Sequence, residues 1–427
     1  MKICTISFHS CPYSSLGGNG SGGMSVYLRE LTAGLVDFPG ISVDILTRAQ
    51  APVCVEAKYV SPQIRVIQLK GGPETPLNRK DMYEFIPEFS ENLEDYIHCQ
   101  KEDYDIIHSH YWLSGLAGVY IKKKLGLPLV HTYHTLGFMK GRAVHQKEHK
   151  SRANSERHIA NVSDLIISPS KEERESLIKE YGISPSKIEV VHPGVNPRLF
   201  YPGENRMILK KTGIHPDDLV LLYVGRIEPV KGLFHVIEAL KIMKKKNPHL
   251  FKRIKLLVIG GGKKEEELFD NEEVSRIKEQ VEQHGLKNKV SFLGSIDHSK
   301  LRKYYSVADA LVVPSLYESF GLVTVEALAC GTPILVSQIG KMGSIVKEGK
   351  NGFSFCPDDP ISLLQGIENL FIHREKLWSS GSIREDILGR FSWDKTAEKT
   401  YLIFEEQLKN VLRSKTIFQP DESLRPA

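Results

Sequence analysis

Two carboxylates eight positions apart, Glu318 and Glu326, are the first residues whose types and spacing indicate chemistry. The apolar run 310–313 before them predicts a buried strand, and Gly321 suits a tight turn after it. A helical pattern follows through Ala329. Glu318 is therefore expected in a strand-to-helix loop, and Glu326 about two turns into the helix.

Such a loop lies at the carboxyl end of a strand, where open α/β sheets bind their ligands. The helix N-terminus beside it favours anions. Two carboxylates next to this helix start suit a ligand with phosphates and many hydroxyls, such as a nucleotide sugar. The alternative is structural: Glu318 would cap the helix, and Glu326 would be a solvated helix residue.

Two cations, Arg226 and Lys231, lie five positions apart in one loop after the predicted strand 219–224. Both can therefore reach a single diphosphate. A departing nucleotide diphosphate develops negative charge, which fixed cations and N–H donors stabilise where no metal is bound. The alternative is that both are surface charges at a helix start, which fits less well beside the glycines of this loop.

A glycine-rich loop, residues 10–23, follows the first predicted strand. Gly18, Gly20 and Gly23 match the spacing of a dinucleotide-binding loop, but about nine residues separate them from the strand. The acidic residue expected after the second strand is also missing. A nicotinamide enzyme and a loop without a ligand remain alternatives. The favoured interpretation is that the backbone N–H groups of Gly22 and Gly23 approach a phosphate.

Four histidines end two predicted strands: His108 with His110, and His131 with His134. Alternate residues of a strand face one side, so such pairs could share a metal. A zinc site would need a third close ligand. Polar side chains at strand ends in a cleft explain the histidines better, and no metal is expected.

Strands and helices alternate along the chain in two series, which indicates an α/β protein with parallel sheets. A polar stretch rich in Pro and Gly separates the two series. We predict two doubly wound, Rossmann-like domains, a closing helix and a disordered tail, at residues 1–200, 201–390, 391–413 and 414–427. Further helices are expected at 299–306 and 378–388.

The composition is that of a globular enzyme: of 427 residues, 41% are hydrophobic and 26% charged. A net charge of +5 is too small to indicate nucleic-acid binding but fits an anionic substrate. Six scattered cysteines indicate reduced thiols. The sequence shows no signal-peptide pattern and no apolar run near the ~20 residues that span a bilayer, so a cytoplasmic protein is expected. Lysine runs at 122–124 and 244–246 leave peripheral membrane contact open.

The carboxylate stretch resembles the motif of the family 4 retaining glycosyltransferases, in which Glu-x-Phe-Gly is followed by a second Glu. Other segments resemble the same family, and together they cover nearly the whole chain. They are the phosphate loop 22–27, the interdomain turn 193–196, the donor-phosphate motif 224–226 with Lys231, and the start of the closing helix, 391–393. The interdomain turn of the family usually carries Asp where this chain has Asn196.

This resemblance implies a GT-B fold, in which two Rossmann-like domains face each other and the final helix crosses back to the first domain. The first domain would bind the acceptor and the second the nucleotide sugar, with no metal or cofactor required. UDP-glucose or UDP-N-acetylglucosamine is the implied donor. The implied reaction is hexosyl transfer with retention of configuration.

The resemblance also implies roles for single residues. Glu326 would bind the donor ribose, and Glu318 would contact hydroxyls of the transferred sugar and stabilise positive charge on it. The main-chain carbonyl of His134 would face the reacting carbon, and Arg226 and Lys231 would complete the catalytic set. The full set of expected donor contacts is Gly22, Gly23, Arg226, Lys231, Glu318, Phe320, Gly321, Leu322 and Glu326.

The segments 105–115 and 131–137 resemble most closely the branch of sucrose-phosphate synthases and D-inositol-3-phosphate glycosyltransferases. A phosphorylated sugar or cyclitol is therefore the implied acceptor. Ser25 departs from the branch, because the inositol enzymes usually have Asn there, and this leaves the acceptor's identity open. The expected acceptor contacts are Ser25, Lys80, Tyr111, Thr135 and Arg152.

Two other classes of protein stay open. One is a nucleotide-sugar epimerase or phosphorylase of similar fold, although no lysine for pyridoxal phosphate can be singled out. The other is a non-catalytic sugar-binding module, against which the intact set of charged donor-site residues argues. The expected partners are the two small substrates, with no nucleic acid and no stable membrane insertion. The sequence leaves the oligomeric state open.

Overall fold

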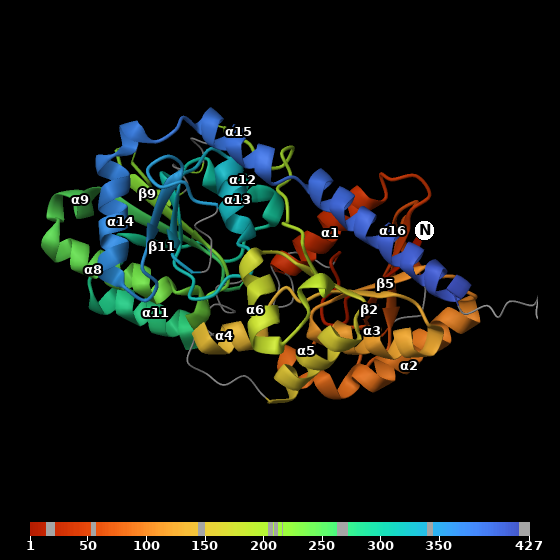
Figure 1. Cartoon of the computed structure of the whole chain (residues 1–427). Helices are drawn as coiled ribbons and strands as arrows, with labels where there is room; N and C mark the ends of the chain where they lie inside the picture. Colours follow the sequence, from red (N-terminus) through yellow and green to blue (C-terminus); the bar gives the residue numbers. More distant parts are fainter. Residues whose placement is uncertain are drawn as a thin grey trace, which may run out of the picture.

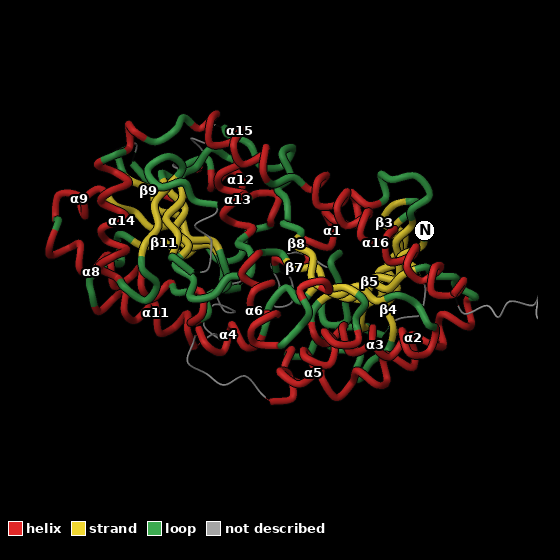
Figure 2. Tube along the Cα trace, viewed as in Figure 1, coloured by secondary structure: helices red, strands yellow, loops and turns green. Residues whose placement is uncertain are grey.

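The computed structural model contains two α/β domains side by side, each built on its own sheet (Figure 1, Figure 2). It describes residues 1–13, 22–52, 57–143, 150–203, 208, 212–215, 217–262, 272–339 and 345–417. Gly18 and Gly20 of the glycine-rich loop, and residues 418–427 of the expected tail, lie outside the described residues.

The first domain contains an eight-stranded sheet in the order β3-β4-β2-β1-β5-β6-β7-β8. Neighbouring strands are parallel, except that β3 pairs antiparallel with β4 at one edge. The strands are β1 (Lys2–Ile6), β2 (Ser42–Arg48), β3 (Ala57–Ser61), β4 (Ile64–Leu69), β5 (Ile106–His110), β6 (Leu129–Thr132), β7 (Leu165–Ser168) and β8 (Ile188–Val190). The helices are α1 (Gly23–Leu35), α2 (Ile86–Gln100), α3 (Trp112–Leu125), α4 (Gly137–Ala143), α5 (Lys150–Val162) and α6 (Lys171–Tyr181).

Alternate side chains of the central strand β1 enter two hydrophobic cores, as the two-residue repeat of a strand requires. Cys4 and Ile6 pack with α2 and α3, whereas Ile3 packs with α1 and with the C-terminal helix α16 (Trp393–Ile417). All three side chains are fully buried. Burial on both faces explains why this central strand carries apolar side chains on both of its sides.

The second domain contains a fully parallel, six-stranded sheet in the order β11-β10-β9-β12-β13-β14. The strands are β9 (Leu219–Val224), β10 (Ile254–Ile259), β11 (Val290–Phe292), β12 (Ala310–Val313), β13 (Ile334–Ser337) and β14 (Gly352–Phe355). The helices are α8 (Leu233–Lys246), α9 (Pro248–Arg253), α11 (Glu272–Gln283), α12 (Arg302–Tyr305), α13 (Leu322–Ala329), α14 (Pro360–Ile372) and α15 (Ser380–Arg390). This confirms the prediction of two parallel α/β domains.

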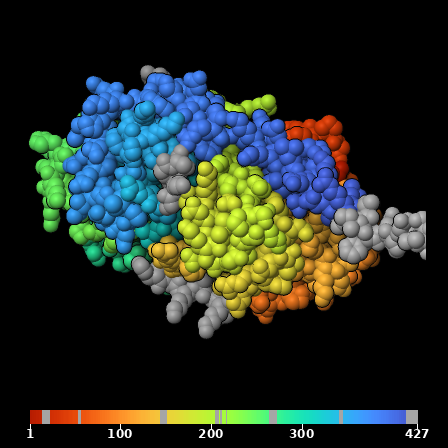
Figure 3. Space-filling view, in the orientation of Figure 1, coloured from red at the N-terminus to blue at the C-terminus, as the bar shows by residue number. Residues whose placement is uncertain are grey.

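The last helix, α16, leaves the second domain and lies along the first, beside α1 (Figure 1). The space-filling view shows the same segment, in blue, lying across the first domain (Figure 3). Trp393, Ala397 and Phe404 are buried in the core that contains α1. The packing is close, because a Cβ on Gly34 would lie 2.8 Å from the Cβ of Ala397. The chain therefore crosses between the domains twice, as the resemblance implies.

Three of the expected helices have clearly different boundaries. The helix expected at 299–306 consists of two pieces, a 3₁₀ turn (His298–Lys300) and α12. The helix expected from 378 begins at Ser380, because the hydroxyl of the preceding serine caps it. The closing helix extends to Ile417, into the segment expected as tail. Within the described residues, no helix is both long and apolar enough to cross a membrane.

Candidate active site

The residues singled out in the sequence lie at the carboxyl ends of strands in both sheets. Glu318 follows β12 in the second domain, and His134 follows β6 in the first. The two sheet edges approach each other, since a Cβ on Gly23 at the start of α1 would lie 3.5 Å from Leu322 Cδ1 at the start of α13. The predicted acceptor residues therefore lie in the first domain together with Gly22 and Gly23, and the other predicted donor residues face them from the second domain.

Lys231 and Glu318, both predicted to be catalytic, form an ion pair with 2.5 Å between Nζ and Oε2. Lys231 ends a 3₁₀ turn (Pro229–Lys231), after which Gly232 has a φ of +68°. A Cβ on Gly232 would lie 2.0 Å from the carbonyl oxygen of Pro314. Only glycine therefore lets this turn lie against the loop that carries Glu318.

Arg226 pairs with Glu228, with 2.5 Å between Nη1 and Oε1, and about half of its side chain is exposed (51%). It also lies close to the first domain. Burial lowers the pKa of His9 there, and the charges of Arg79, Arg152 and Arg226 lower it further. The positive charge of Arg226 on the second domain therefore acts on His9 of the first domain, together with the charges of Arg79 and Arg152.

Glu326 is buried one turn into α13, because the helix begins at Leu322; the expected depth of about two turns is wrong. Both carboxylate oxygens have partners: Oε1 lies 2.7 Å from His298 Nε2, and Oε2 accepts from the Tyr305 hydroxyl at 2.9 Å. Burial alone would lower the pKa of His298, but the charge of Glu326 and this hydrogen bond raise it above its ordinary value. Glu326 is therefore not a solvated helix residue.

The two neighbours of Glu318 in the sequence both contact the first domain. The Tyr317 hydroxyl accepts a hydrogen bond from the N–H of Leu136 at 3.2 Å. On the other side, Ser319 Oγ donates to Glu173 Oε2 at 2.8 Å. The loop that carries Glu318 is therefore fastened to the first domain on both sides of that residue.

Phe320 and Gly321 follow in the same loop. The Phe320 ring packs at the joint between the domains, with its centroid 6.0 Å from the His192 ring and 5.6 Å from the Phe391 ring. The ring is thus engaged by aromatic neighbours from both connections between the domains. Gly321 has a φ of +86° and directly precedes α13, whose N-terminus favours an anion.

Tyr111 lies between charged groups on the acceptor side. Its ring centroid is 5.5 Å from the guanidinium carbon of Arg79 and 5.3 Å from that of Arg152. The His9 ring lies 4.5 Å away. Lys80, which the sequence singled out, is exposed in the same short turn (Arg79–Asp81), while its neighbour Arg79 contacts Tyr111. Spacing alone does not tell which of two adjacent cations turns inward.

Arg152 joins several of the predicted acceptor residues. Its Nε donates to Glu156 Oε1 at 2.8 Å, and one terminal nitrogen donates to the carbonyl of Thr135 at 2.8 Å. The hydroxyl of Thr135 in turn donates to the carbonyl of His134 at 2.7 Å. Burial raises the pKa of Glu156, although the nearby arginine opposes this. Arg152 and Thr135 are thus brought together next to the main-chain carbonyl of His134.

His134 has a φ of +59°, an unusual conformation for a residue other than glycine. Its Nε2 lies 2.9 Å from His110 Nδ1, and burial lowers its pKa to about 3. The ring is therefore neutral at physiological pH. Ser25 is buried in α1, where its Oγ lies 3.1 Å from that of Ser10. Within the described part of the chain, no three His, Cys, Asp or Glu side chains converge to hold a metal.

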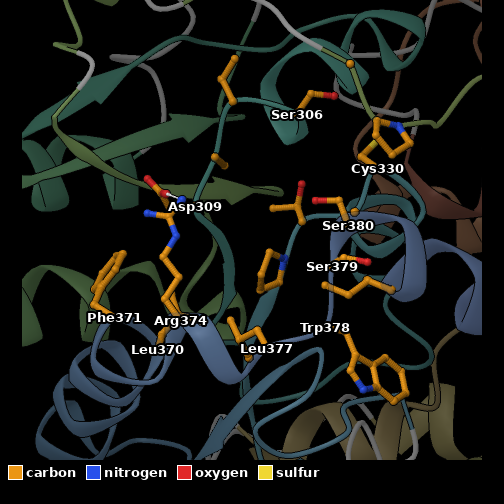
Figure 4. A pocket seen from close by; sticks show the side chains of 18 residues that line it. Ser306, Asp309, Cys330, Leu370, Phe371, Arg374, Leu377, Trp378, Ser379 and Ser380 are labelled. Carbon is orange, nitrogen blue, oxygen red and sulfur yellow. Dashed lines mark ion pairs between the residues drawn. The ribbon is translucent and has the colours of Figure 1, made fainter.

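A cavity of about 530 Å³ lies at the opposite edge of the second sheet. Its lining includes Asp309 and Thr332, which precede β12 and β13 (Figure 4). Arg374 spans part of its wall in an ion pair with Asp309, at 2.7 Å. This cavity contains none of the residues predicted from the sequence, and it lies at the amino ends of strands, where such sheets rarely bind substrates.

Comparison with known families matches both halves of the chain. The model of the family described as "Glycosyltransferase Family 4" matches residues 21–199, and that of "Glycosyl transferases group 1" matches residues 205–378. D-inositol 3-phosphate glycosyltransferase 2 of Catenulispora acidiphila is 31% identical and covers 96% of both chains. D-inositol 3-phosphate glycosyltransferase of Thermobispora bispora is 32% identical and covers 97% of this chain and 96% of its own.

Solved structures share the fold. Sucrose-phosphate synthase from Thermosynechococcus elongatus superposes with a TM-score of 0.85 and 30% identity, over 96% of this chain and 99% of its own. Anabaena HepE in complex with UDP and glucose has the same fold, with a TM-score of 0.75 and 18% identity over 95% of this chain and 100% of its own. The chain belongs to glycosyltransferase family 4 and is a glycosyltransferase with the GT-B fold.

Proposed function

We propose that the enzyme transfers a hexosyl group from a UDP-sugar to a phosphorylated sugar or cyclitol, with retention and without a metal ion. The observation that carries this proposal is the distribution of charge across the interdomain site. Lys231, paired with Glu318, lies on the second domain, and two arginines flank Tyr111 on the first. Cations on both sides suit a donor diphosphate that faces an acceptor phosphate.

On the donor side, Arg226 and Lys231 would bind the diphosphate, together with the first N–H groups of α1 and α13. The glycines at both helix starts, Gly23 and Gly321, let a phosphate approach the backbone closely. Glu326 would accept hydrogen bonds from the ribose. HepE, which shares the fold, has been solved with UDP and with UDP-glucose, so a UDP-sugar is the donor to test first.

In the proposed reaction, the acceptor oxygen attacks the anomeric carbon on the face from which the diphosphate departs. The bond from this carbon to the diphosphate oxygen breaks, its electron pair stays on that oxygen, and the same oxygen takes the acceptor's proton. Glu318 and the His134 carbonyl would stabilise positive charge on the sugar ring. Attack on this face retains configuration, and no pair of carboxylates spaced as in glycoside hydrolases is needed.

On the acceptor side, Arg152 and Arg79 would bind the phosphate, with the hydroxyls of Tyr111 and Thr135 nearby. Lys80 would contribute charge from the exposed side. The names of the two inositol 3-phosphate relatives and of the sucrose-phosphate synthase support a phosphorylated acceptor. Ser25 would contact the part of the acceptor that distinguishes it within the branch.

We also propose that the work is divided by domain. Residues 1–200 would bind the acceptor, residues 201–390 the nucleotide sugar, and residues 391–413 would hold the two together. The break between the two matching family models, between residues 199 and 205, supports this division.

A panel of sugars and cyclitols, each with and without its phosphate, tests the acceptor, with UDP release as the readout. We expect turnover with a phosphorylated member, and Arg152→Ala should remove the preference for the phosphate. Arg157→Ala is the matched control, because Arg157 is an exposed arginine of the same helix. A preference for unphosphorylated acceptors, or an Arg152→Ala protein that treats both forms as wild type does, would contradict the proposal.

A further inference from the structure

Glu173 lies in the first turn of α6, where its carboxylate makes an unusual contact. The spacing Ser170-x-x-Glu173 is that of a capping box, in which the serine hydroxyl and the glutamate carboxylate each bind the other's backbone N–H. The first half is present, since the Glu173 N–H donates to Ser170 Oγ at 3.2 Å. The carboxylate is directed to the other domain instead: Oε2 accepts from Ser319, and Oε1 has no partner among the described residues.

This carboxylate is almost fully buried, with 1% of the residue exposed. The titratable groups that face it are Tyr27 of α1, Tyr133 after β6, Glu156 of α5 and Tyr317 of the Glu318 loop, and none of these carries a positive charge. Burial raises the pKa of Glu173 to about 8, the charge of Glu156 adds to this, and the Ser319 hydrogen bond opposes it. At neutral pH the group is therefore mostly a neutral acid, whose burial costs less than that of a carboxylate.

The position of this acid matters because Ser319 directly follows Glu318. With Tyr317 bound to the backbone of Leu136, both neighbours of Glu318 are hydrogen-bonded to the first domain. The ion pair with Lys231 fixes the carboxylate from the second domain. Glu318 can thus reach a sugar between the domains in this geometry only while its loop stays fastened.

We propose that Glu173 is a positioning residue for Glu318: through Ser319 it fastens the loop that carries Glu318 to the first domain. The significance of Glu318 for catalysis rests on the proposed function, whereas the interdomain contact itself does not. A loop released from Glu173 would displace the Glu318 carboxylate, and with it the partner of Lys231, while Arg226 and its partner Glu228 stay in place. The expected kinetic signature is therefore a change in kcat with little change in donor affinity.

The fastening is also sensitive to pH. A Glu173 released into water has the ordinary pKa of a carboxyl, whereas in the fastened loop its pKa is about 8, so the fastened loop keeps a proton that the released one loses. The fastened state is therefore fully favoured below the ordinary carboxyl pKa. Its stability relative to the released loop falls as pH rises from the ordinary carboxyl pKa to about 8. Above that pH the stability stays constant, because Glu173 is then ionised in both states.

The test compares Glu173→Gln, which is neutral and isosteric, with Glu173→Leu, which removes the hydrogen bond. Glu173→Gln should keep kcat within about twofold at pH 7 and flatten the fall of kcat between about pH 5 and 8. Glu173→Leu and Ser319→Ala should each lower kcat about tenfold, and the double variant should be no worse than either. Glu172→Gln, which removes a charge in the same helical turn, should behave as wild type.

Hydrogen exchange of residues 314–321 and UDP affinity by calorimetry provide readouts that need no acceptor. We expect faster exchange in Glu173→Leu than in Glu173→Gln, with UDP affinity unchanged in both. Unchanged kcat and exchange in Glu173→Leu, or a Glu173→Gln pH profile identical to wild type, would overturn the proposal. If wild type turns over no acceptor, the proposed function fails, and the exchange difference still decides the role of Glu173.

Discussion

Both donor-side cations contact a carboxylate of their own domain, Lys231 with Glu318 and Arg226 with Glu228. Such pairs hold long side chains in place, which reduces the rotamer freedom that is lost when a diphosphate binds. The pairing also couples the residues, because removing Glu318 frees Lys231 to move. Substitutions at these two positions should therefore not have independent effects.

We expect Arg226→Ala and Lys231→Ala each to lower kcat by ~10²–10³, because each removes charge stabilisation from the departing diphosphate. Lys231→Ala combined with Glu318→Ala should cost less than the sum of the two. UDP release measures turnover, circular dichroism checks folding, and Lys241→Ala on α8 is the control for a surface lysine. Near-normal turnover of a folded Arg226→Ala protein would refute the donor-site assignment.

The protonated side chain of His298 should stabilise the fold through Glu326. Since this pairing raises the pKa of His298 above 6.5, its contribution is complete below that value and is lost as pH rises through the raised pKa. The loss in free energy of unfolding caused by His298→Gln should thus be larger at pH 6 than at pH 9. Chemical denaturation at both pH values measures it, and a loss equal at both would contradict the charged pair.

Residues carried by a short motif were predictable from the sequence, and their partners were not. Lys231 and Glu318 were both predicted, and the structure joins them. His298 and Tyr305 reach Glu326 from 28 and 21 positions away, and no local pattern marks them. Motifs therefore predict a chemistry for the site, while the groups that orient its residues depend on tertiary packing.

At the scale of elements, the two connections between the domains lie together. Val195 and Ser392 form a parallel bridge, and a Cβ on Gly194 would lie 2.2 Å from the backbone nitrogen of Trp393. Backbone atoms cannot rotate aside as the end of a flexible side chain can. Residue 194 must therefore be a glycine for α16 to start where it does.

Gly194→Ala should destabilise the protein by about 1–3 kcal/mol, because the added methyl group overpacks the start of α16. Thermal unfolding measures this as a lower midpoint. Gly389→Ala is the control: it lies in α15, nothing lies within 4 Å of its added Cβ, and alanine favours a helix. The control should leave the midpoint unchanged or raise it. A Gly194→Ala protein as stable as the control would contradict the close contact.

The order of the elements was predictable because apolar runs alternate with helical patterns. The helical pattern before Ala329, for example, corresponds to α13 (Leu322–Ala329). Strand β3 was missed, because it is an edge strand with three consecutive exposed residues and thus lacks an apolar pattern. The helix expected at 299–306 is divided because Asp297 caps a 3₁₀ turn at its start, with Oδ1 accepting from the Ser299 N–H at 2.9 Å.

At the scale of the whole molecule, two domains bring charges of both signs to one site. The cations nearest the expected diphosphate are side chains, Arg226 and Lys231. We therefore expect activity to persist in excess EDTA, measured as UDP release, with a manganese-dependent glycosyltransferase treated in parallel as the control. Loss of activity that added manganese restores would mean that the leaving group depends on a metal.

The two-domain architecture was predictable from the restart of the strand–helix pattern, but the placement of the domains against each other was not. That placement depends on contacts such as Ser319 with Glu173, which are 146 positions apart. No sequence motif contains both Ser319 and Glu173, so neither residue could be predicted as the partner of the other. The resemblance to a family predicted that the two domains face each other, and the structure shows which residues contact each other between them.

The two connections between the domains, at Gly194 and Ser392, lie together and form a single hinge. Both connecting segments pass at one place, so a rotation of the second domain relative to the first has its axis there. Residues near this axis, such as Phe320 against Phe391, are displaced little by such a rotation, and loops farther away are displaced more. Two adjacent connecting segments also resist a twist of one domain against the other, so a hinge rotation of the domains is easier than a twist. A substitution that stiffens the connections at Gly194 and Ser392 should therefore slow the rotation of the two domains in both directions, without contacting either substrate.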